Sequence, residues 1–306
     1  MARPTVVARL PAAPGVYRFR DDAGRVAYLG RATDLRSRVG SYWGDLADRP
    51  HLRRMIPQVA TVEALECDSV HEAAWLERNL LERARPRWNR LRGGLEVPTW
   101  IALDRRPDAA SLSVVHSPAD APRATVYGPY LGGGQTRLAV AGLERALALA
   151  YAGRPRGGFD RDMARVRGVA DGDLDARVAR VVAVLTRDPD AVAELLGVLV
   201  RRRAEAASAC AFEVAARVQA ELEAVAWVTS EQKVTRRVGA HDGDLDAHGW
   251  CEGVLVTLEV RAGRLSRWLQ RPADDAAARH LVAATPGTWH GFADRAARLA
   301  ARLAQP

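Results

Sequence analysis

A carboxylate stands where an apolar side chain is expected in the segment that follows Ser69. A helix over residues 70–84 has an apolar face made of Ala73, Leu76, Leu80, Leu81 and Ala84. At about 100° per residue, Glu77 falls inside that apolar arc, whereas Glu72 and Glu82 fall outside it. A buried carboxylate needs a partner, which is an arginine in a buried salt bridge or a metal ion. Mg²⁺ suits such a position, because it binds through one or two carboxylates and keeps several waters.

An arginine and two tyrosines upstream have side chains suited to phosphate chemistry. Arg38 borders a helical stripe formed by Leu35, Val39 and Tyr42, so it can reach from the edge of that helix into a shared cleft. Its alternative interpretation is an ordinary surface arginine. Tyr17 and Tyr28 lie one on each strand of an expected hairpin, where paired tyrosines are commonly packing residues.

The elements that must position these side chains follow from local patterns. Residues 15–20 alternate apolar and basic side chains, which predicts a strand. Asp21-Asp22-Ala23-Gly24 predicts a hairpin turn, and the spacing of Ser69 and Glu72 predicts a capping box at the start of a helix. Pro86 ends that last helix. In chain order we expect a strand over 15–20, a returning strand over 26–30, a helix from Thr33-Asp34, a short strand over 61–67 and a helix over 70–84.

The remainder of the chain divides by composition. Residues 93–190 predict strands at 100–103 and 112–115, a turn-rich loop at 128–134, an alanine-rich helix over 136–151 and a flexible loop over 152–158. Residues 191–230 predict two helices broken near 208–211, the second with Phe212, Ala215, Ala216, Leu222 and Ala226 along one stripe. Residues 237–306 predict a small α+β tail with a hairpin of strands 254–260 and 264–269 that turns at Ala262-Gly263.

Composition favours a polyanionic partner. The 306 residues carry a formal net charge of +8 with a pI of about 10.1, and nearly all of the positive charge is arginine. Arginine makes forked phosphate contacts, and each neutralised phosphate releases counterions. Cys67, Cys210 and Cys251 lie far apart without a C-x-x-C spacing, so we expect neither a disulfide framework nor an iron–sulfur cluster. The start of the chain lacks a long apolar segment, so we expect a cytoplasmic protein with no membrane association.

The order and spacing of four motifs resemble a known family. Gly15-Val16-Tyr17, followed about ten residues later by Tyr28-Leu29-Gly30, is similar to the paired motif of the GIY-YIG nucleases. The segment Arg31–Tyr42 resembles the one that follows in UvrC-type excinucleases. Glu72–Leu80 resembles the glutamate helix of the family, and Arg85-Pro86-Arg87-Trp88-Asn89 its closing motif.

The resemblance extends further along the chain. Tyr127–Tyr130 matches a turn that follows the nuclease domain in UvrC-type proteins, and Phe212–Arg217 is similar to the UVR motif, the helical hairpin that binds UvrB. It implies partner-binding roles for Phe212, Glu213, Ala215 and Ala216.

Several positions depart from the family pattern. Arg31 replaces the usual lysine, Gly40 a commonly basic residue, and Gln219 and Ala220 a usual Arg-Asp pair. The four cysteines common after the middle segment are missing, and the length leaves no room for the second nuclease and helix-hairpin-helix modules of full UvrC. This shortened layout resembles the single-nuclease UvrC homologues called Cho.

The resemblance implies a role for each motif residue in phosphodiester hydrolysis. Tyr17 is the general base on water, directly or by relay. A phenol with a pKa near 10 needs neighbouring positive charge for this, and Arg31 could supply that field. Arg38 holds the scissile phosphate, Glu77 holds one Mg²⁺ or Mn²⁺, and Tyr28 orients the water or the phosphate. The amide of Asn89 orients its neighbours without acid–base chemistry.

Three other segments have weaker chemistry. His241–His248 is rich in metal-ligand types but lacks the spacing and closing glutamate of a calcium loop, so we expect a solvated loop. Gly132-Gly133-Gly134 lacks the lysine of a phosphate loop. Trp88 and Trp100 flank basic residues and could stack on bases, although core packing is the more common role.

We therefore expect an α+β, modular protein. A small mixed GIY-YIG sheet with flanking helices over 1–92 is followed by a middle domain over 93–190, a UVR-like hairpin over 191–236 and a small α+β domain over 237–306. The expected function is metal-dependent incision of damaged DNA in nucleotide excision repair, on the 3′ side of the lesion, with DNA and a UvrB-like helicase as partners. The alternatives are a non-catalytic adaptor that binds DNA and such a helicase, and a nuclease acting on branched DNA.

Overall fold

The computed structural model describes the chain except residues 1–2, 45, 47–49, 90–96, 154–156, 171, 232–235, 238–243, 262–263 and 306. It has two compact units. Unit 1 joins residues 1–95, 232–234 and 241–306, and unit 2 joins residues 96–231 and 235–240. The four-part division expected from the sequence stays a prediction, and each unit is described below by itself.

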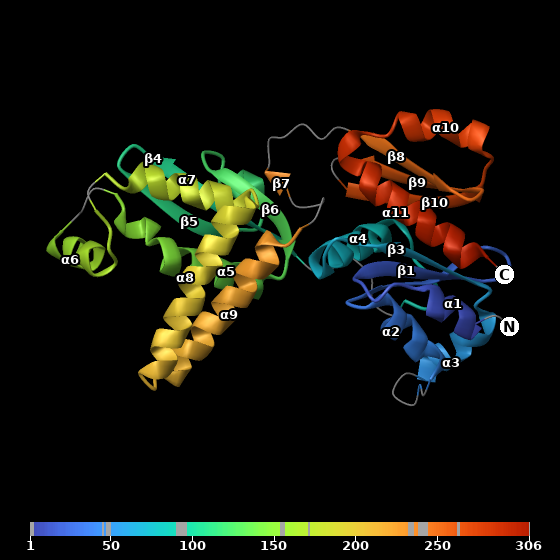
Figure 1. Cartoon of the computed structure of the whole chain (residues 1–306), viewed down its shortest axis with the longest axis horizontal. Helices are drawn as coiled ribbons and strands as arrows, with labels where there is room; N and C mark the ends of the chain where they lie inside the picture. The colour runs from blue at the N-terminus through green and yellow to red at the C-terminus, as the bar shows by residue number, and fades with distance from the viewer. Residues whose placement is uncertain are drawn as a thin grey trace. The chain divides into compact units, whose positions relative to one another are not determined.

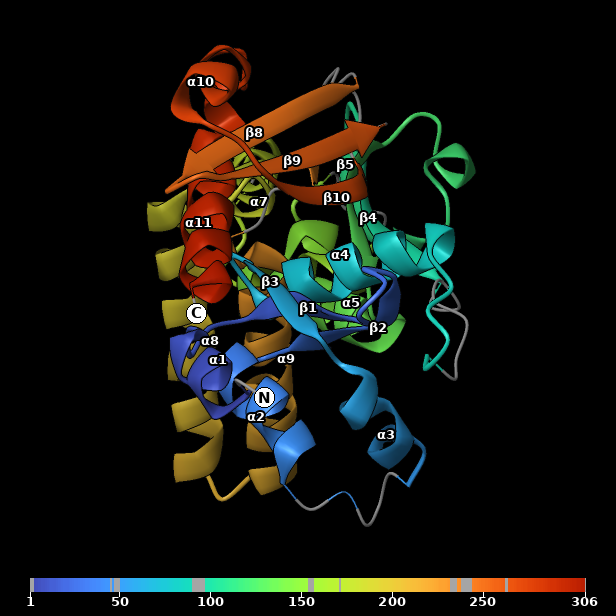
Figure 2. The ribbon, with the colours of Figure 1, turned by 90° about the vertical axis from the view of Figure 1, so that its right-hand side faces the viewer.

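The first sheet of unit 1 is built by the motif strands. Its strands are β1 (Gly15–Arg20), β2 (Val26–Ala32) and β3 (Thr61–Glu66), in the order β2-β1-β3 (Figures 1 and 2). Both pairings are antiparallel, where we expected a mixed sheet. The predicted turn joins β1 to β2. Gly24 adopts a φ of 73°, and the carboxylate of Asp21 accepts the amide of Arg25.

Short helices flank this sheet. They are α1 (Arg3–Arg9), α2 (Leu35–Gly40), the 3₁₀ turn η1 (Ser41–Trp43), α3 (Pro50–Met55), the 3₁₀ turn η2 (Ile56–Gln58) and α4 (Val70–Arg83). Asp34 caps α2 and Ser69 caps α4, each through a side-chain oxygen that accepts a backbone amide. Both predicted helix starts are therefore confirmed.

The C-terminal segment adds a second sheet to the same unit. Strands β8 (Leu245–Cys251), β9 (Val254–Arg261) and β10 (Arg264–Pro272) pair antiparallel in the order β10-β9-β8, followed by α10 (Asp275–Ala283) and α11 (Gly287–Ala304). The predicted strands are confirmed, and their turn at Ala262-Gly263 lies outside the described residues. Figures 1 and 2 both show α4 and α11 between the two sheets.

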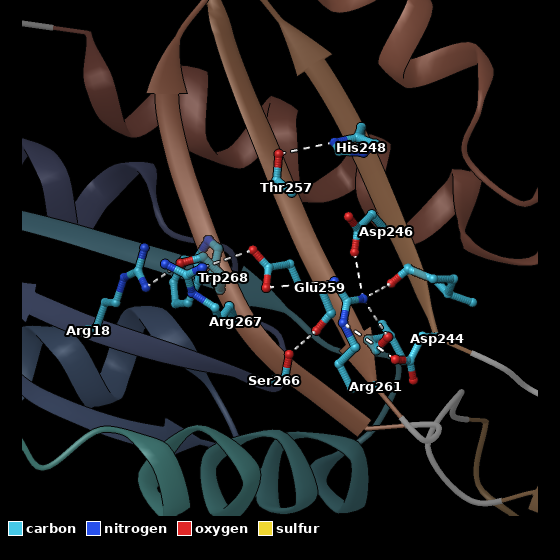
Figure 3. Close-up of polar contacts among 12 residues, drawn as sticks. Arg18, Asp244, Asp246, His248, Thr257, Glu259, Arg261, Ser266, Arg267 and Trp268 are labelled. Atoms are coloured by element: carbon cyan, nitrogen blue, oxygen red, sulfur yellow. Dashed lines mark hydrogen bonds and ion pairs between the residues drawn. The ribbon is translucent and has the colours of Figure 1, made fainter.

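Specific contacts join the C-terminal segment to the first sheet. Leu299 and Leu303 of α11 pack into the core formed around Tyr17 and Phe19. Arg18 of β1 lies over the ring of Trp268 at 3.9 Å and donates to its carbonyl oxygen at 2.7 Å (Figure 3).

Of the segment 241–248, which we expected to be a solvated loop, residues 245–248 lie in strand β8, and residues 241–243 lie outside the described residues. Asp246 and His248 are strand residues. Arg261 forms ion pairs with Asp244, Asp246 and Glu259 (Figure 3). Within the described part of the chain, no group of three or more His, Cys, Asp or Glu side chains is placed to hold a metal ion. This acidic cluster is thus neutralised by an arginine.

Unit 2 contains a sheet covered by long helices. Its strands are β4 (Pro98–Arg106), β5 (Ala109–Val115), β6 (Thr125–Leu131) and β7 (Arg236–Arg237), in the order β5-β4-β6-β7. Its helices and 3₁₀ turns are η3 (Pro118–Asp120), α5 (Gly133–Leu147), η4 (Leu149–Tyr151), α6 (Gly158–Val166), α7 (Leu174–Leu185), α8 (Pro189–Ser208) and α9 (Phe212–Thr229).

Two expectations for unit 2 are wrong. The turn-rich loop at 128–134 is instead the second half of β6 and the start of α5, because Gly128 and Pro129 are accommodated beside a register shift in β4. The stripe of α9 that is buried consists of Val218, Glu221, Ala224, Val225 and Val228, whereas Phe212 is 69% exposed. The helical periodicity of the sequence does not indicate that α9 packs on α5 through the buried Glu221, which pairs with Arg145.

None of the helices among the described residues is both long and apolar enough to cross a membrane.

Candidate active site

A cavity of about 430 Å³ in unit 1 collects most of the predicted site residues. It is lined by Tyr17, Tyr28, Gly30, Arg31, Ala32, Thr33, Arg38, Val70 and Glu77. These residues come from β1, β2, α2 and the first turns of α4, segments separated by up to about 60 positions in the chain. The hairpin and the two capped helices therefore bring the motif residues to one place.

Tyr17 and Tyr28 line the cavity, and the ring of Tyr42 packs against both of them. The hydroxyl oxygens of Tyr17 and Tyr42 lie 2.7 Å apart in a buried hydrogen bond, and the ring of Tyr28 lies 6.2 Å from that of Tyr17. Burial raises the pKa of Tyr17 well above its ordinary value, and the neighbouring Tyr42 and Tyr28 raise it further. Burial, followed by Tyr42, likewise raises the pKa of Tyr28. Without a bound cation, the raised pKa values therefore keep Tyr17 and Tyr28 neutral at physiological pH.

Arg38 is the cation that acts on this cluster. Its guanidinium carbon lies 5.5 Å from the centre of the Tyr42 ring, and its charge lowers the pKa of Tyr17 against the effect of burial. We expected Arg31 to supply that field. Arg31 instead forms an ion pair with the carboxylate of Glu77 at 3.4 Å.

Glu77 faces the cavity with its side chain 22% exposed. The expectation that Glu72 lies outside the buried face of α4 is wrong, because Glu72 is 1% exposed. Its carboxylate turns back and accepts a hydrogen bond from the backbone amide of Asp68 at 2.6 Å, while the side-chain hydroxyl of Ser69 accepts one from the backbone amide of Glu72. Ser69 thus caps α4 as predicted, but the Glu72 carboxylate accepts the amide of Asp68 and not that of Ser69, so the reciprocal bond of a capping box is not formed; Glu72 is buried, and Glu77 faces the cavity.

The donor set fits a single hydrated divalent cation. Glu77 is the only carboxylate among the residues that line the cavity, and the cavity has room for bound water. Mg²⁺ is held through one or two carboxylates and keeps several waters, so one glutamate in an open cavity is sufficient. The nearby Arg31 is displaceable, because its side chain is 40% exposed.

Two residues shape the site without acid–base chemistry. Gly30 pairs with Tyr17 across the sheet, and a β-carbon at position 30 would lie 2.6 Å from the Tyr17 hydroxyl. Asn89 accepts the amide of Leu29 at 3.0 Å and donates to the carbonyl of Leu29 at 2.7 Å. Asn89 is outside the cavity lining, and its amide fixes the strand that carries Tyr28 and Arg31.

The partner-binding residues predicted from the sequence lie in unit 2. Phe212 and Glu213 are exposed at the start of α9, as is Ala216, whereas Ala215 is half-buried. Val214 is also exposed, at 47%. This leaves an apolar surface at the tip of the α8–α9 hairpin, separate from the cavity residues in the sequence and in the fold.

Sequence reasoning missed two parts of the site. Tyr42 was interpreted as one apolar member of a helical stripe, although its hydroxyl bonds to Tyr17. Thr33 was treated only as the start of a helix, although it lines the cavity. The signal for Tyr42 was available, since a buried tyrosine hydroxyl usually has a hydrogen-bond partner. The tryptophans were better anticipated: Trp100 is buried in a core and Trp88 packs beside the Tyr17 cluster.

Comparison with known proteins agrees with the location of this cavity. Residues 13–90 match the family model of the UvrC-like GIY-YIG domain. The UvrABC system protein C of Natronomonas pharaonis is 36% identical over 228 residues, which cover 71% of this chain and 38% of the relative. That of Haloarcula marismortui is 34% identical over 228 residues, with the same two shares. The chain therefore spans less than half the length of these relatives.

One solved structure is similar to part of this chain. It is the GIY-YIG N-terminal endonuclease domain of UvrC from Thermotoga maritima, bound to its catalytic magnesium. It is 30% identical, covers 28% of this chain and 93% of its own, and has a TM-score of 0.26.

Proposed function

Because this chain belongs to the UvrC-type GIY-YIG nucleases, we propose that it incises damaged DNA in nucleotide excision repair by hydrolysing one phosphodiester on the 3′ side of the lesion. The observation that carries the proposal is that Tyr17, Arg38 and Glu77 line one cavity. A base, a phosphate ligand and a metal ligand are the groups that phosphodiester hydrolysis needs.

Glu77 is the residue that would hold the divalent cation, Mg²⁺ or Mn²⁺. When bound there, the cation polarises the phosphate, stabilises the leaving 3′ oxygen and adds positive charge beside the phenols. Support comes from the exposure of Glu77 to the cavity and from the magnesium in the related domain of Thermotoga maritima. Cys67, Cys210 and Cys251 cannot supply four ligands from one chain, so the proposal includes no iron–sulfur cluster.

The remaining residues bind, orient and move a proton. Arg38 binds the scissile phosphate and stabilises the negative charge that rises on it. Tyr17 would take the proton of the attacking water in its phenolate form, which the positive charges of Arg38 and of the bound cation would favour, and the Tyr42 hydroxyl can donate a hydrogen bond to that phenolate. Tyr28 orients the water or the phosphate from the facing strand. Arg31 balances the charge of Glu77 before substrate binds.

We also propose that the α8–α9 hairpin binds a UvrB-like helicase. The relatives are components of the UvrABC system. Phe212 and Val214 expose apolar surface at the tip of the hairpin, where a helical partner can cover it. Gln219 bridges the two helices, since it accepts from Arg203 and donates to Glu223.

The test is a nicking assay on a duplex with a single bulky lesion. The protein is incubated with Mg²⁺, with and without a UvrB-like helicase, and the product ends are mapped. We expect metal-dependent incision on the 3′ side of the lesion that the helicase stimulates. Binding without incision in any divalent metal would identify an adaptor, and preferential incision of branched over damaged duplexes would identify the second alternative.

A further inference from the structure

Three arginines follow the catalytic helix in a short segment. Arg83 is the last residue of α4, and Arg85 and Arg87 come next in the sequence Arg-Ala-Arg-Pro-Arg. All three are exposed. Arg87 lies over the ring of Trp88 at 5.3 Å, and among the described residues none of the three makes an ion pair. We call Arg83, Arg85 and Arg87 the arginine strip.

Two other arginines of unit 1 have carboxylate partners. Arg78 pairs with Glu82 one turn earlier, and Arg295 pairs with Asp68. Arginines that lie close together without carboxylate partners repel one another. This repulsion raises the free energy of the folded chain until a polyanion neutralises the charge. The arginine strip therefore carries a net positive charge that phosphate groups can neutralise.

The strip is fixed beside the cavity. The amide of Trp88 donates to the carbonyl of Ala27 at 3.1 Å, and Asn89 makes two hydrogen bonds to Leu29. The segment thus runs along β2, whose next residues, Gly30 and Arg31, line the cavity. Because these hydrogen bonds hold the segment in place before DNA binds, the segment loses less conformational entropy when it contacts a phosphate backbone.

The length of the arginine strip can be compared with the spacing of phosphates along duplex DNA. Arg83 follows Glu77 by six helical positions, which is about 9 Å along α4. Arg87 is two residues from Asn89, or at most about 7 Å of backbone. Duplex DNA carries one phosphate charge for about every 1.7 Å of its axis, so a segment of about 10 Å presents roughly six phosphates. Long arginine side chains can reach several of these.

We propose that the arginine strip docks the phosphate backbone of the substrate duplex next to the scissile phosphate. The inference rests on the proposed function, because it assigns a DNA contact to the same site. In the sequence, Arg90 and Arg92 continue the run beyond the described residues. The strip carries affinity, whereas Arg38 and Glu77 carry the rate.

The experiment compares two triple variants of the full chain. In the first, Arg83→Gln, Arg85→Gln and Arg87→Gln are combined. The matched control combines Arg279→Gln, Arg298→Gln and Arg302→Gln, which are exposed on α10 and α11 and remove the same charge. Affinity for a lesion-containing duplex is titrated over a series of salt concentrations in Ca²⁺, and single-turnover cleavage is measured in Mg²⁺ at saturating DNA.

The strip variant should lower the slope of log affinity against log salt by about 2.7, which is about 0.9 for each of three lost phosphate contacts. The control should keep the parental slope, and a strip variant with three lysines should largely restore it. At saturating DNA the strip variant should cut within a few-fold of the parent. A slope equal to that of the control overturns the inference. A parent that binds but does not cut overturns the proposed function instead, and leaves the slope comparison intact.

Discussion

Glu77 and Arg38 both line the cavity, and we propose a distinct chemical role for each of them. Glu77 is held on α4 at the cavity wall with Arg31 as its neighbour. Arg38 instead faces the phenols of Tyr17 and Tyr42. Substitution of Glu77 should therefore affect metal-dependent cleavage, whereas substitution of Arg38 should lower the cleavage rate more than the DNA affinity.

Glu77→Gln should keep the fold and abolish cleavage in Mg²⁺, because an amide is a far weaker ligand for a hard cation. Cleavage is measured in single turnover, with thermal unfolding as the check on folding. Glu82→Gln is the matched control, since Glu82 is on the same helix but pairs with Arg78. Near-normal cleavage by Glu77→Gln would remove Glu77 from the metal site.

Arg38→Ala should bind DNA within a few-fold of the parent and cut at least about a hundredfold more slowly, since loss of a transition-state donor typically costs 10²–10³ in rate. The salt slope should fall by only about one, as for one lost phosphate contact. Binding is titrated in Ca²⁺ and cleavage in Mg²⁺. Equal large losses of affinity and rate would make Arg38 a docking residue and contradict its catalytic role.

Gly30→Ala tests the packing of the tyrosine cluster. The added methyl carbon would lie 2.6 Å from the Tyr17 hydroxyl and 2.8 Å from its ring carbon, so Tyr17 must move. We expect DNA affinity close to the parent and a large fall in the cleavage rate, because misplacement by about 1 Å can cost about 10²-fold. Gly24→Ala is a contrasting variant outside the site; it strains a positive φ in the turn and should lower stability more than rate.

Individual residues show where sequence reasoning succeeds and where it ends. Helical periodicity located Glu77 on the inner side of α4, but it placed Glu72 outside, because an angle on a helical wheel ignores the return of a capping side chain to the backbone. Tyr42 was missed because its partner Tyr17 is 25 residues away. The resemblance identified Tyr17, Arg38 and Glu77, while the placement of Arg31 required the fold.

At the scale of elements, local signals predicted local structure. The hairpin turn before Arg25, the caps at Asp34 and Ser69, and the break between α8 and α9 lie where the sequence indicates. The segment 128–134 was mispredicted, because glycine and proline indicate a turn by propensity while pairing with β4 holds them in a strand. Tertiary pairing overrides propensity at such places.

Phe212→Asp should weaken binding of a UvrB-like helicase without changing the fold, because Phe212 is 69% exposed and contributes little to the core. A charged group in the apolar tip would be desolvated on docking. Binding is measured by pull-down with purified helicase. Val200→Asp on α8 is the matched control for an exposed apolar residue on the other helix, at 41% exposure. Equal retention of the helicase by Phe212→Asp and the parent would show that the tip is not the contact.

At the scale of the molecule, the sequence did not reveal which segments share a core. We expected a small α+β domain over 237–306, and this division stays a prediction; in the structure, residues 241–306 form one compact unit with residues 1–95. Packing between segments more than about 200 residues apart leaves no periodic signal. It depends on single contacts such as that between Arg18 and Trp268. The second sheet therefore supports the strand that carries Tyr17.

Trp268→Ala tests whether the second sheet stabilises strand β1. Trp268 is 2% exposed and packs under the Arg18 guanidinium, whose other partner is Glu63. Truncation should cost about 3–5 kcal/mol, the usual range for a buried tryptophan, and leave Arg18 partly unpaired. Because Arg18 adjoins Tyr17 in β1, cleavage should become heat-labile well below the parental temperature.

Hydrogen exchange followed by mass spectrometry should locate the loss of stability. Protection should fall in β1, β3 and β10 of unit 1, while the helices of unit 2 keep theirs, because the contact lies wholly inside unit 1. Leu269→Ala is the control one residue further along β10. Leu269 is 38% exposed and should cost less than about 1 kcal/mol. If Trp268→Ala lowered protection only in β8–β10, the two sheets would unfold independently, and the C-terminal segment would be a separate domain after all.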